Sequence, residues 1–564
     1  MITTDKTGVS ALIKHCLSYG MTHFVCSPGS RNAPIVIALD EHPDVRTIII
    51  HDERSAGFYA LGMAQQLQAP VGLVCTSGSA MLNYYPAVAE AYYQCVPLVV
   101  LSADRPEEWV NHGDGQTIVQ KGVYQNHIQY EYTVPEFIND TGLTVFNSNV
   151  SNAFDAALVG WQGPIHFNIP LSEPLYNSLE VDYQPAELVE FGDLEEADLK
   201  LDEFSELWKS SERKMIICGQ LERDDALNTN LAEIAKDTSV AVLVENTSNL
   251  TDGNFIQCID RTLGSINENE IEQYRPEVIV TLGRAVVSKR IKKFLRESNL
   301  RSHWKIGFDF PEMDTYRALS NSIKVAPNTF VYRVLKQIGI LNNSTFGNRW
   351  KQNDYLVQDK LVGYFDDIPY SDLSVFETVL DYLPENSLLH MGNSSVVRYC
   401  QLFDPIKSIH YFSNRGTSGI DGSLSTACGA SVIVKDKYNV MITGDVSFFY
   451  DSNALWSNYL GENLRIILIN NSGGGIFKII EGPSRTHQLE KYFVTEQKTK
   501  AKDLCKAFGV KYFNATSIEG IEAQMDDFYN TEDKQGAKLI EIETPNGIND
   551  IVLKEFFKYL KIKR

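Results

Sequence analysis

Residues 438–475, with the sequence YNVMITGDVSFFYDSNALWSNYLGENLRIILINNSGGG, decide the fold. Two apolar runs in this stretch, Asn439–Thr443 and Arg465–Ile469, have the length and composition of buried strands. Between them lies a helix-like segment, Ser452–Tyr459. A strand, a helix and a second strand in this order predict a βαβ unit with parallel strands and a right-handed crossover.

Oxygen-bearing side chains follow both strands of this unit. Asp445 comes after the first strand and Asn471 after the second, 26 positions later (471 − 445). Parallel strands end at the same edge of a sheet, so we expect the two side chains to lie close together where α/β sheets bind ligands. With the carbonyl of Gly473 they offer the oxygen ligands that Mg²⁺ prefers, often shared with a diphosphate. The alternative is an ordinary acidic loop beside a polar strand end.

Strands and helices alternate along the whole chain in three segments. These segments cover residues 1–183, 201–340 and 348–564, and the acidic stretch Gln184–Asp202 is typical of a linker. At 564 residues the chain is too long for a single hydrophobic core. The pattern therefore predicts an α/β protein with three doubly wound parallel-sheet domains.

Composition and charge limit the classes of partner. A net charge of −21 with 43% hydrophobic residues is typical of a soluble globular protein and disfavours binding to nucleic acid or anionic membranes. No apolar run reaches the roughly 20 residues of a membrane span, and the polar start lacks the features of a signal peptide. Nine scattered cysteines without a Cys-x-x-Cys pair argue against disulfides and a zinc site. We therefore expect a cytoplasmic protein with no membrane insertion.

The pattern around Asp445 and Asn471 resembles the metal-binding signature of thiamine diphosphate enzymes. Val446 departs from it, because that signature has a glycine there. The three-part layout is similar to that of the pyruvate-oxidase type of these enzymes. This resemblance implies an N-terminal pyrimidine-binding domain, a central α/β domain, and a C-terminal domain that binds the diphosphate and Mg²⁺.

A second acidic position lies in the segment His51–Gly57, between a predicted strand and a predicted helix. A carboxylate at a helix start can serve as an N-terminal cap, which suits Asp52. The resemblance implies that the next residue, Glu53, is the catalytic carboxylate that hydrogen-bonds N1′ of the cofactor's aminopyrimidine ring. It also implies that Glu53 reaches a cofactor held by another subunit, so that the active unit is at least a dimer.

Five further segments narrow the family. They are Ser27–Pro34, Ser102–Pro106, Gly392–Ser394 with Arg398, Ser413–Gly422 and Gly473–Phe477. Together they are similar to the 2-succinyl-5-enolpyruvyl-6-hydroxy-3-cyclohexene-1-carboxylate synthases, which are transferases (carboligases) of menaquinone biosynthesis. The resemblance implies decarboxylation of 2-oxoglutarate and addition of the succinic semialdehyde carbanion to isochorismate. It also implies thiamine diphosphate with Mg²⁺ or Mn²⁺, in a homodimer or homotetramer.

Both implied substrates are dicarboxylates, which a strongly acidic protein can bind only where cationic side chains are gathered. Arginine suits this task because its planar guanidinium can bind a carboxylate through two parallel hydrogen bonds. The resemblance assigns substrate contacts to Ser30, Arg31, Arg105, Gln116, Lys289, Ser394, Arg398, Arg415, Ile476 and Phe477. The alternatives are surface salt bridges for the arginines and core packing for Phe477.

The cofactor residues follow from the same resemblance. Gly416, Thr417, Ser418 and Gly444 are candidates for holding the diphosphate, and Ile420 is the bulky residue that supports the bent cofactor. The metal ligands would be Asp445, Asn471 and Gly473, the first two also counting as cofactor-binding residues. Gly115 departs from the family, which often has Asn before Gln116.

Three other interpretations stay open on the sequence alone. One is a simple 2-oxoacid decarboxylase or an acetolactate-type ligase, although neither needs four arginines in its site. Another is a cofactor-binding homologue without catalytic activity, against which the intact Glu53, Asp445 and Asn471 argue. A flavin- or nicotinamide-dependent oxidoreductase is disfavoured, because no Gly-x-Gly-x-x-Gly occurs at a strand–helix junction.

Overall fold

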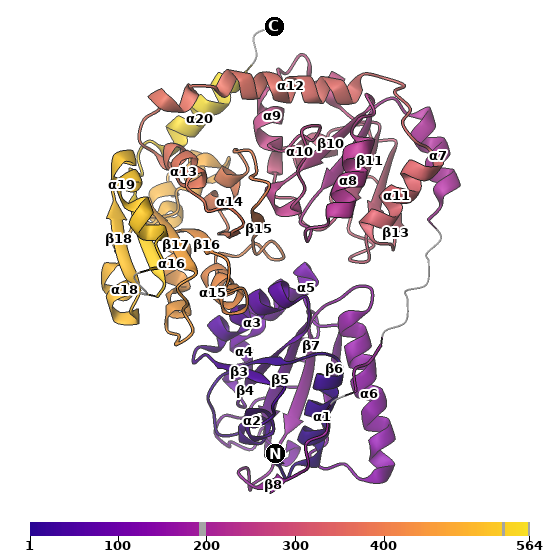
Figure 1. The fold of residues 1–564 in the computed structure, drawn as a ribbon, viewed down its shortest axis with the longest axis vertical. Helices are drawn as coiled ribbons and strands as arrows, with labels where there is room; N and C mark the ends of the chain where they lie inside the picture. Colours follow the sequence, from indigo (N-terminus) through magenta and orange to yellow (C-terminus); the bar gives the residue numbers. More distant parts are fainter. Residues whose placement is uncertain (186, 191–198, 533–535, 562–564) are drawn as a thin grey trace.

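The chain folds into three α/β units, each built on a parallel sheet (Figure 1). The computed structural model describes residues 1–185, 187–190, 199–532 and 536–561. Part of the predicted linker Gln184–Asp202 therefore lies outside the described residues. The three parallel sheets confirm the predicted fold class. Over the described ranges, no helix combines the length and apolar character needed to cross a bilayer.

The N-terminal sheet has six parallel strands. In spatial order they are β3 (Arg46–Ile49), β2 (His23–Cys26), β4 (Val71–Cys75), β5 (Leu98–Asp104), β7 (Ile165–Pro170) and β6 (Tyr130–Thr133). Its helices include α1 (Thr7–Ser18), α2 (Ala33–Asp40), α3 (Glu53–Leu67), α4 (Ser79–Asn83), α5 (Tyr85–Gln94) and α6 (Asp140–Leu158). β4 and β5 are buried along their whole length, which explains why their sequences are continuously apolar rather than alternating.

The middle sheet has five parallel strands. In spatial order they are β10 (Val240–Val244), β9 (Lys214–Cys218), β11 (Val278–Leu282), β12 (Ser302–Ile306) and β13 (Leu319–Ile323). Helices that matter below are α8 (Asp225–Ile234), α9 (Ile259–Ser265), α10 (Lys289–Arg296) and α12 (Phe346–Leu361). Apolar clusters fill both faces of this sheet, one around Trp304 and the other around Trp350.

The C-terminal sheet repeats the six-stranded plan. In spatial order its strands are β15 (His410–Phe412), β14 (Leu388–Met391), β16 (Asn439–Gly444), β17 (Leu464–Asn470), β19 (Lys538–Glu543) and β18 (Lys511–Ala515). Its helices include α13 (Asp372–Asp381), α14 (Ser395–Cys400), α15 (Ser423–Ile433), α16 (Asp445–Tyr450), α17 (Ile476–Ile479) and α20 (Asn549–Leu560). The register of β16 on β17 brings the ends of both strands to one edge.

Strand order places a topological switch point in both six-stranded sheets. The chain runs from β2 out to β3 and returns to β4 on the other side of β2; it repeats this path with β14, β15 and β16. A crevice forms at the carboxyl ends where the order reverses, and α/β proteins bind ligands there. The loop Ser27–Pro34 follows β2, and the segment Gly392–Ser394 follows β14. Two of the segments singled out in the sequence thus lie at switch points.

The predicted helix Ser452–Tyr459 is wrong. The helical segment after β16 is α16, which starts seven residues earlier (452 − 445) and is followed by a 3-10 turn at Ser452–Leu455. The polarity of Asp445 obscured this start, because a side chain that projects toward a cavity interrupts the apolar pattern of a helix. The βαβ order itself is as predicted.

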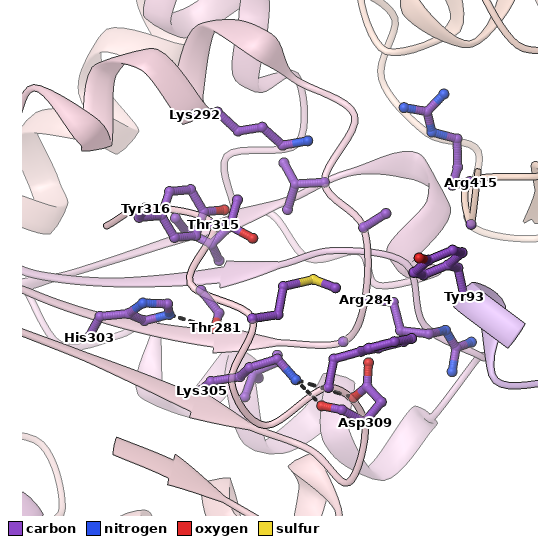
Figure 2. A pocket seen from close by; sticks show the side chains of 18 residues that line it. Tyr93, Thr281, Arg284, Lys292, His303, Lys305, Asp309, Thr315, Tyr316 and Arg415 are labelled. Atoms are coloured by element: carbon purple, nitrogen blue, oxygen red, sulfur yellow. Dashed lines mark hydrogen bonds and ion pairs between the residues drawn. The ribbon is translucent and has the colours of Figure 1, made fainter. Parts of the chain in front are cut away.

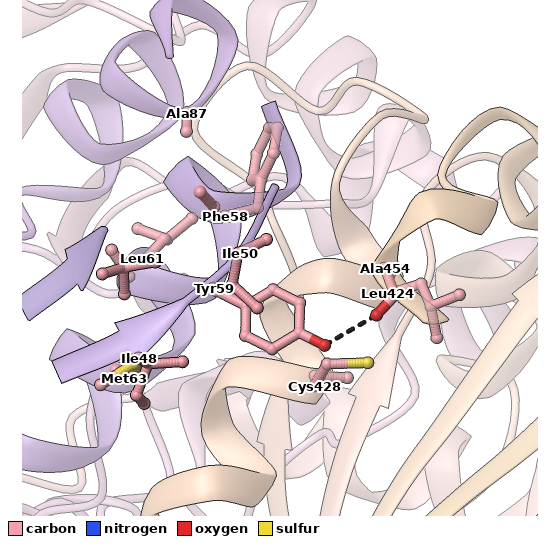
Figure 3. Packing of buried hydrophobic residues seen from close by; sticks show 14 of the residues in the cluster. Ile48, Ile50, Phe58, Tyr59, Leu61, Met63, Ala87, Leu424, Cys428 and Ala454 are labelled. Carbon is pink, nitrogen blue, oxygen red and sulfur yellow. Dashed lines mark hydrogen bonds between the residues drawn. The ribbon is translucent and has the colours of Figure 1, made fainter. Parts of the chain in front are cut away.

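The N-terminal and C-terminal units share one apolar core, in which α3 packs on α15 (Figure 3). An added Cβ at Gly62 of α3 would lie 1.9 Å from the carbonyl oxygen of Thr426 on α15. The reverse also holds, because a Cβ at Gly429 would lie 2.1 Å from the carbonyl oxygen of Tyr59. The Tyr59 hydroxyl donates to the carbonyl of Ala454 at 2.7 Å. Glycines on both helices therefore permit backbone-to-backbone contact.

A buried group of amides joins all three units. Gln220 of the middle unit donates through Nε2 to Oε1 of Gln94 at 3.0 Å and to the carbonyl of Ser413 at 3.1 Å. Gln94 in turn donates to Glu90 at 2.6 Å. Gln65 donates to the same Gln94 oxygen at 3.0 Å. We call these residues (Gln65, Glu90, Gln94, Gln220 and Ser413) the amide junction, and it borders the loop that carries Arg415.

Candidate active site

A cavity of about 160 Å³ opens at the switch point between β14 and β16. We call it the switch-point cavity. All of its lining residues lie between Asp372 and Thr495, in the C-terminal unit. The predicted residues among them are Ser394, Ile420, Gly444, Asp445, Asn471, Gly473, Ile476 and Phe477. The structure therefore brings the three predicted metal ligands to one cavity.

Asp445 is the only acidic ligand among the predicted three. It begins α16, and burial raises the pKa of its carboxyl group to about 6. Hydrogen bonds oppose this shift, among them one from Nε2 of Gln497 to Oδ2 at 2.6 Å. A buried carboxylate at a sheet edge is costly without a counter-charge, which favours a cation at this position.

Asn471 supplies an amide oxygen beside Asp445. Its Nδ2 donates to Oδ2 of Asp372 at 2.9 Å, while its Oδ1 is buried with no hydrogen-bond partner. An unpaired buried acceptor in a polar cavity is the group expected of a ligand to a hard cation. The glycine turn packs tightly here, since a Cβ at Gly474 would lie 2.7 Å from the carbonyl oxygen of Phe493. These residues fit Mg²⁺ or Mn²⁺ together with a diphosphate.

No group of three or more His, Cys, Asp or Glu side chains is placed to hold a metal within the described ranges. The predicted site is not a cluster of this kind, because its ligands are one carboxylate, one side-chain amide oxygen and one backbone carbonyl. Oxygen ligands of this kind suit Mg²⁺, which keeps several of its ligands for water and phosphate.

A second cavity, of about 180 Å³, adjoins the first, because Ser395 and Ile476 line both. We call it the cationic cavity. Its charged side chains are Lys289 and Arg290 from the start of α10, Arg398 from α14, and Asp260 from α9. Its apolar wall consists of Leu402, Ile476, Ile479, Ile480, Leu553 and Phe557. The structure thus brings Lys289 to the same cavity as Arg398.

Arg398 is held in place by its own helix. One guanidinium nitrogen donates to the carbonyl of Ser394, which precedes α14 in a left-handed conformation with φ of 72°. Burial lowers the pKa of Arg398, and the carboxylates of Asp260 and Glu245 act in the opposite direction. The negative charges of Asp260 and Glu245 therefore partly offset the cost of burying the positive charge of Arg398.

The N-terminal unit gathers a separate group of predicted residues at the ends of β2 and β5. Arg31 is buried; it donates to the carbonyl of Leu171 at 3.0 Å and pairs with Glu173 at 3.2 Å. Burial lowers the pKa of Arg31, and the nearby charge of Arg105 adds to that effect. Arg105 pairs with Asp114 at 3.3 Å. Arg31 and Arg105 are thus neighbouring cations, each with a carboxylate partner in this chain.

The remaining members of this N-terminal group lie on its surface. Ser30 is exposed in the loop after β2, and Gln116 is exposed with φ of 53°. The carbonyl of Gln116 accepts a hydrogen bond from the Ser77 hydroxyl at 2.9 Å, which fixes its loop against the end of β4. Ser30, Arg31, Arg105 and Gln116 are absent from the lining of both the switch-point and the cationic cavity.

Glu53 is the first residue of α3, directly after the N-cap Asp52. Burial raises the pKa of its carboxyl group, the Asp52 charge adds to the rise, and the side chain of Asn83 opposes it. Glu53 also lines neither of these cavities. In a single chain the predicted catalytic carboxylate and the predicted metal ligands therefore lie apart, and we call the two places half-sites.

Arg415 and the residues after it have other partners in this chain. The buried Arg415 donates to Oδ1 of Asn393 at 2.7 Å. The amides of Gly416 and Thr417 donate to the carboxylate of Glu90 at 2.7 and 2.6 Å, and the Thr417 hydroxyl donates to the same carboxylate. Ser418 has φ of 62°. Arg415, Gly416, Thr417 and Ser418 do not line the switch-point cavity, so the predicted role of the last three toward a diphosphate stays a prediction.

Arg415 instead faces a third cavity, of about 170 Å³, at the carboxyl ends of the middle strands (Figure 2). Arg284, Lys292 and Lys305 also line it, and Lys305 bonds to Asp309. Burial lowers the pKa of Lys292. This cavity carries excess positive charge, and none of the predicted metal ligands lines it.

Sequence reasoning missed three polar residues of the site. Asp372 bonds to Asn471, Gln497 bonds to Asp445, and Glu90 bonds to Gly416 and Thr417. No local motif marks them. Asp372 lies 99 positions before its partner and Gln497 lies 52 positions after its own, so only the tertiary fold brings each pair together.

Comparisons with known proteins agree with this geometry. Residues 6–129 match the family described as "Thiamine pyrophosphate enzyme, N-terminal TPP binding domain", and residues 391–542 match the corresponding C-terminal TPP binding domain. The two outer units are thus thiamine diphosphate-binding domains. A solved structure of benzoylformate decarboxylase from Polynucleobacter necessarius shares the fold, with a TM-score of 0.71 and 16% identity over 95% of this chain and 98% of that chain.

Full-length relatives define the family more narrowly. The chain is 41% identical to a 2-succinyl-5-enolpyruvyl-6-hydroxy-3-cyclohexene-1-carboxylate synthase from Flavobacterium johnsoniae and 42% identical to one from Christiangramia forsetii. Both alignments cover 98% of this chain and 98% of the relative. Coverage at this level extends across all three units. The chain therefore belongs to the family of 2-succinyl-5-enolpyruvyl-6-hydroxy-3-cyclohexene-1-carboxylate synthases.

Proposed function

We propose that this protein decarboxylates 2-oxoglutarate and adds the resulting succinic semialdehyde carbanion to isochorismate by 1,4-addition. The products are 2-succinyl-5-enolpyruvyl-6-hydroxy-3-cyclohexene-1-carboxylate and CO2, and the pathway is menaquinone biosynthesis. The names of the full-length relatives support this transferase activity. The observation that carries it is the adjoining pair of cavities, one with metal-type oxygen ligands and the other with three cationic side chains.

Asp445, Asn471 and the carbonyl of Gly473 would hold Mg²⁺ or Mn²⁺, which would bridge to the diphosphate of the cofactor. Ile420, also on this cavity, would support the cofactor ring system, and the turn at Gly444 leaves room for the diphosphate. When bound, thiamine diphosphate supplies the nucleophilic carbon and the electron sink for decarboxylation. The protein supplies position and charge around it.

Glu53 would hold a proton at N1′ of the aminopyrimidine ring. Burial raises its pKa, which suits a carboxyl group that must share a proton with a ring nitrogen near neutral pH. The acids that line the switch-point cavity among the described residues are Asp372 and Asp445, and both have structural partners. Glu53 is therefore the catalytic residue of this proposal.

The substrates are small dicarboxylates, and we assign them to the cationic groups. Arg398 and Lys289 would bind the carboxylates of 2-oxoglutarate, beside the apolar surface of Ile476 and Phe477. Arg31, Arg105, Gln116 and Ser30 would bind isochorismate from the other half-site, with Arg415 between them. Charge-assisted pairs of this kind contribute about 1.5–3 kcal/mol each.

Because the two half-sites are separate in one chain, we propose a homo-oligomer, a dimer or a tetramer, with each active site at a subunit interface. Glu53 of one subunit would meet Asp445 of the next. The described cysteines are all free, which supports a cytoplasmic location. Neither nucleic acid nor a membrane is a partner in this proposal.

A paired assay with thiamine diphosphate and Mg²⁺ tests the activity. Consumption of 2-oxoglutarate is followed with and without isochorismate, and the product is identified by mass spectrometry. The proposal expects fast consumption only with both substrates, and an adduct that carries three carboxylates. Equal turnover without isochorismate, with release of succinic semialdehyde, would identify a decarboxylase instead.

A further inference from the structure

The amide of Asn471 is held in one of its two possible orientations. Its Nδ2 lies 2.9 Å from Oδ2 of Asp372, and its Oδ1 is buried without a partner in the described structure. Both residues line the switch-point cavity together with Asp445. Turning the amide by 180° would exchange the two ends and present an N–H group, which cannot bind a cation.

Asp372 is itself held rigidly. It is the first residue of α13, and the amide of the N-cap Ser371 donates to the hydroxyl of Ser374 at 3.0 Å. Its Oδ1 accepts from the hydroxyl of Thr544 at 2.6 Å, and its own amide donates to Oδ1 of Asn549 at 2.9 Å. The carboxylate is fully enclosed, with both oxygens already accepting hydrogen bonds. It is therefore poorly placed to bind a cation directly.

We infer that Asp372 is a positioning residue that orients Asn471 so that Oδ1 faces the metal. A carboxylate can only accept hydrogen bonds, so the NH₂ end of Asn471 must face Asp372 and the oxygen must face the cavity. Groups that hydrogen-bond to a metal ligand on the side away from the metal fix the orientation of that ligand. Losing one such group typically weakens metal binding about 10–100-fold. The inference rests on the metal site of the proposed function.

Binding of Mn²⁺, measured by the electron paramagnetic resonance signal of the free ion with saturating thiamine diphosphate, tests this role without using activity. We expect Asp372→Ala to weaken Mn²⁺ binding about 10–100-fold. Asp372→Asn should lose less Mn²⁺ affinity than Asp372→Ala, because an amide oxygen can still accept a hydrogen bond from Asn471. Equal losses in both variants would assign the effect to charge alone, and unchanged binding in both would overturn the inference.

A double variant separates orientation from the loss of the Asp372 side chain. In Asp372→Ala/Asn471→Asp the ligand is a carboxylate, and either of its oxygens can bind the metal, so no orientation is needed. We expect Mn²⁺ affinity to recover toward that of the unchanged protein. If Asp372→Ala does not fold, Asp372→Asn with Asp372→Asn/Asn471→Asp gives the same comparison, and affinity that stays low in the double variant contradicts the inference.

Two controls complete the test. Asp354 is a buried carboxylate of α12 that accepts from Thr262 and Gln358, and Asp354→Ala should lower stability while leaving Mn²⁺ affinity unchanged. Asp445→Ala tests the metal site itself. If Asp445→Ala leaves Mn²⁺ binding intact, the proposed site is wrong; if it weakens binding and Asp372→Ala does not, only the role of Asp372 is wrong.

Discussion

Glu53 combines a fixed position with a raised pKa, because the N-cap Asp52 holds the start of α3 and burial disfavours the charged carboxylate. We expect Glu53→Gln to reduce turnover by a factor of at least about 100, since an amide cannot exchange a proton with the ring nitrogen. Binding of thiamine diphosphate with Mg²⁺ should survive, as measured by calorimetry. Asp155→Asn, at an exposed position of α6, is the matched control. Full activity of Glu53→Gln would refute the assigned role.

His390 makes stability depend on pH. It is buried in β14, and burial lowers its pKa to about 4, whereas an imidazole in the unfolded chain has a pKa of about 6.5. Below about pH 6.5 the unfolded chain takes up a proton that the folded chain does not, so this contribution to stability is lost as pH falls toward 4.

Urea unfolding of the protein and of His390→Asn tests this effect. Between about pH 7.5 and pH 5 the unchanged protein should lose about 2 kcal/mol more unfolding free energy than the variant. Asparagine can keep the hydrogen bond to Asn439 and does not titrate. Identical pH dependence in the two proteins would show that His390 titrates normally.

Single residues could be predicted where the sequence carries a local pattern. Asp445 and Asn471 were found because each follows an apolar strand, and the structure places both on one cavity. Asp372 and Gln497 carry no such pattern, since a lone polar residue at a helix start or in a loop is most often solvated. Their function depends on distances of 2.9 and 2.6 Å to residues far along the chain.

At the level of elements, the contact between α3 and α15 depends on the absence of a side chain. A Cβ at Gly62 would lie 1.9 Å from the Thr426 carbonyl oxygen, so the helices must separate to admit it. We expect Gly62→Ala to cost about 1–3 kcal/mol, despite the better helix propensity of alanine. Gly253→Ala, where a Cβ meets nothing within 4 Å, should be neutral. Thermal unfolding of both variants makes the comparison, and equal melting temperatures would contradict it.

Strands were predicted more accurately than helices. The predicted strands Asn439–Thr443 and Arg465–Ile469 lie within β16 and β17, because a buried strand is a short apolar run with polar ends. The segment after the Thr76 turn forms two helices, α4 and α5, with Pro86 at the start of the second. Proline lacks the amide hydrogen of a helix interior and favours the first turn. The predicted helix Ser452–Tyr459 failed because the polar Asp445 interrupts the apolar pattern at the start of α16.

At the scale of the whole molecule, the separate half-sites make a prediction about mixed oligomers. We expect Glu53→Gln and Asp445→Ala each to be inactive alone. In a heterodimer purified with two different tags, one active site contains both substitutions and the other contains neither, so about half of the normal activity should return. A heterodimer without activity would place Glu53 and Asp445 of the same chain in one site.

The three-unit architecture followed from the alternation of strands and helices, yet the arrangement of the units did not. The amide junction brings Gln65, Gln94 and Gln220 together, and each of them reads as an ordinary surface residue in the sequence. Contacts between units depend on shape and on pairs of residues far apart in the chain. A single sequence contains no periodic signal for such pairs. Within each unit, by contrast, the strands and helices that form the core carry a repeating pattern of apolar residues.

The packing of α3 on α15 has a consequence for synthesis of the protein. The last residue of α3 precedes the first residue of α15 by 356 positions (423 − 67). At about 5–20 residues per second, a ribosome needs roughly 20–70 s to make that interval. During this time an apolar helix that the finished protein buries on both sides has only one of its two neighbours. The nascent N-terminal domain must therefore be shielded by chaperones or be slow to aggregate. If it is released as a fragment, it should self-associate.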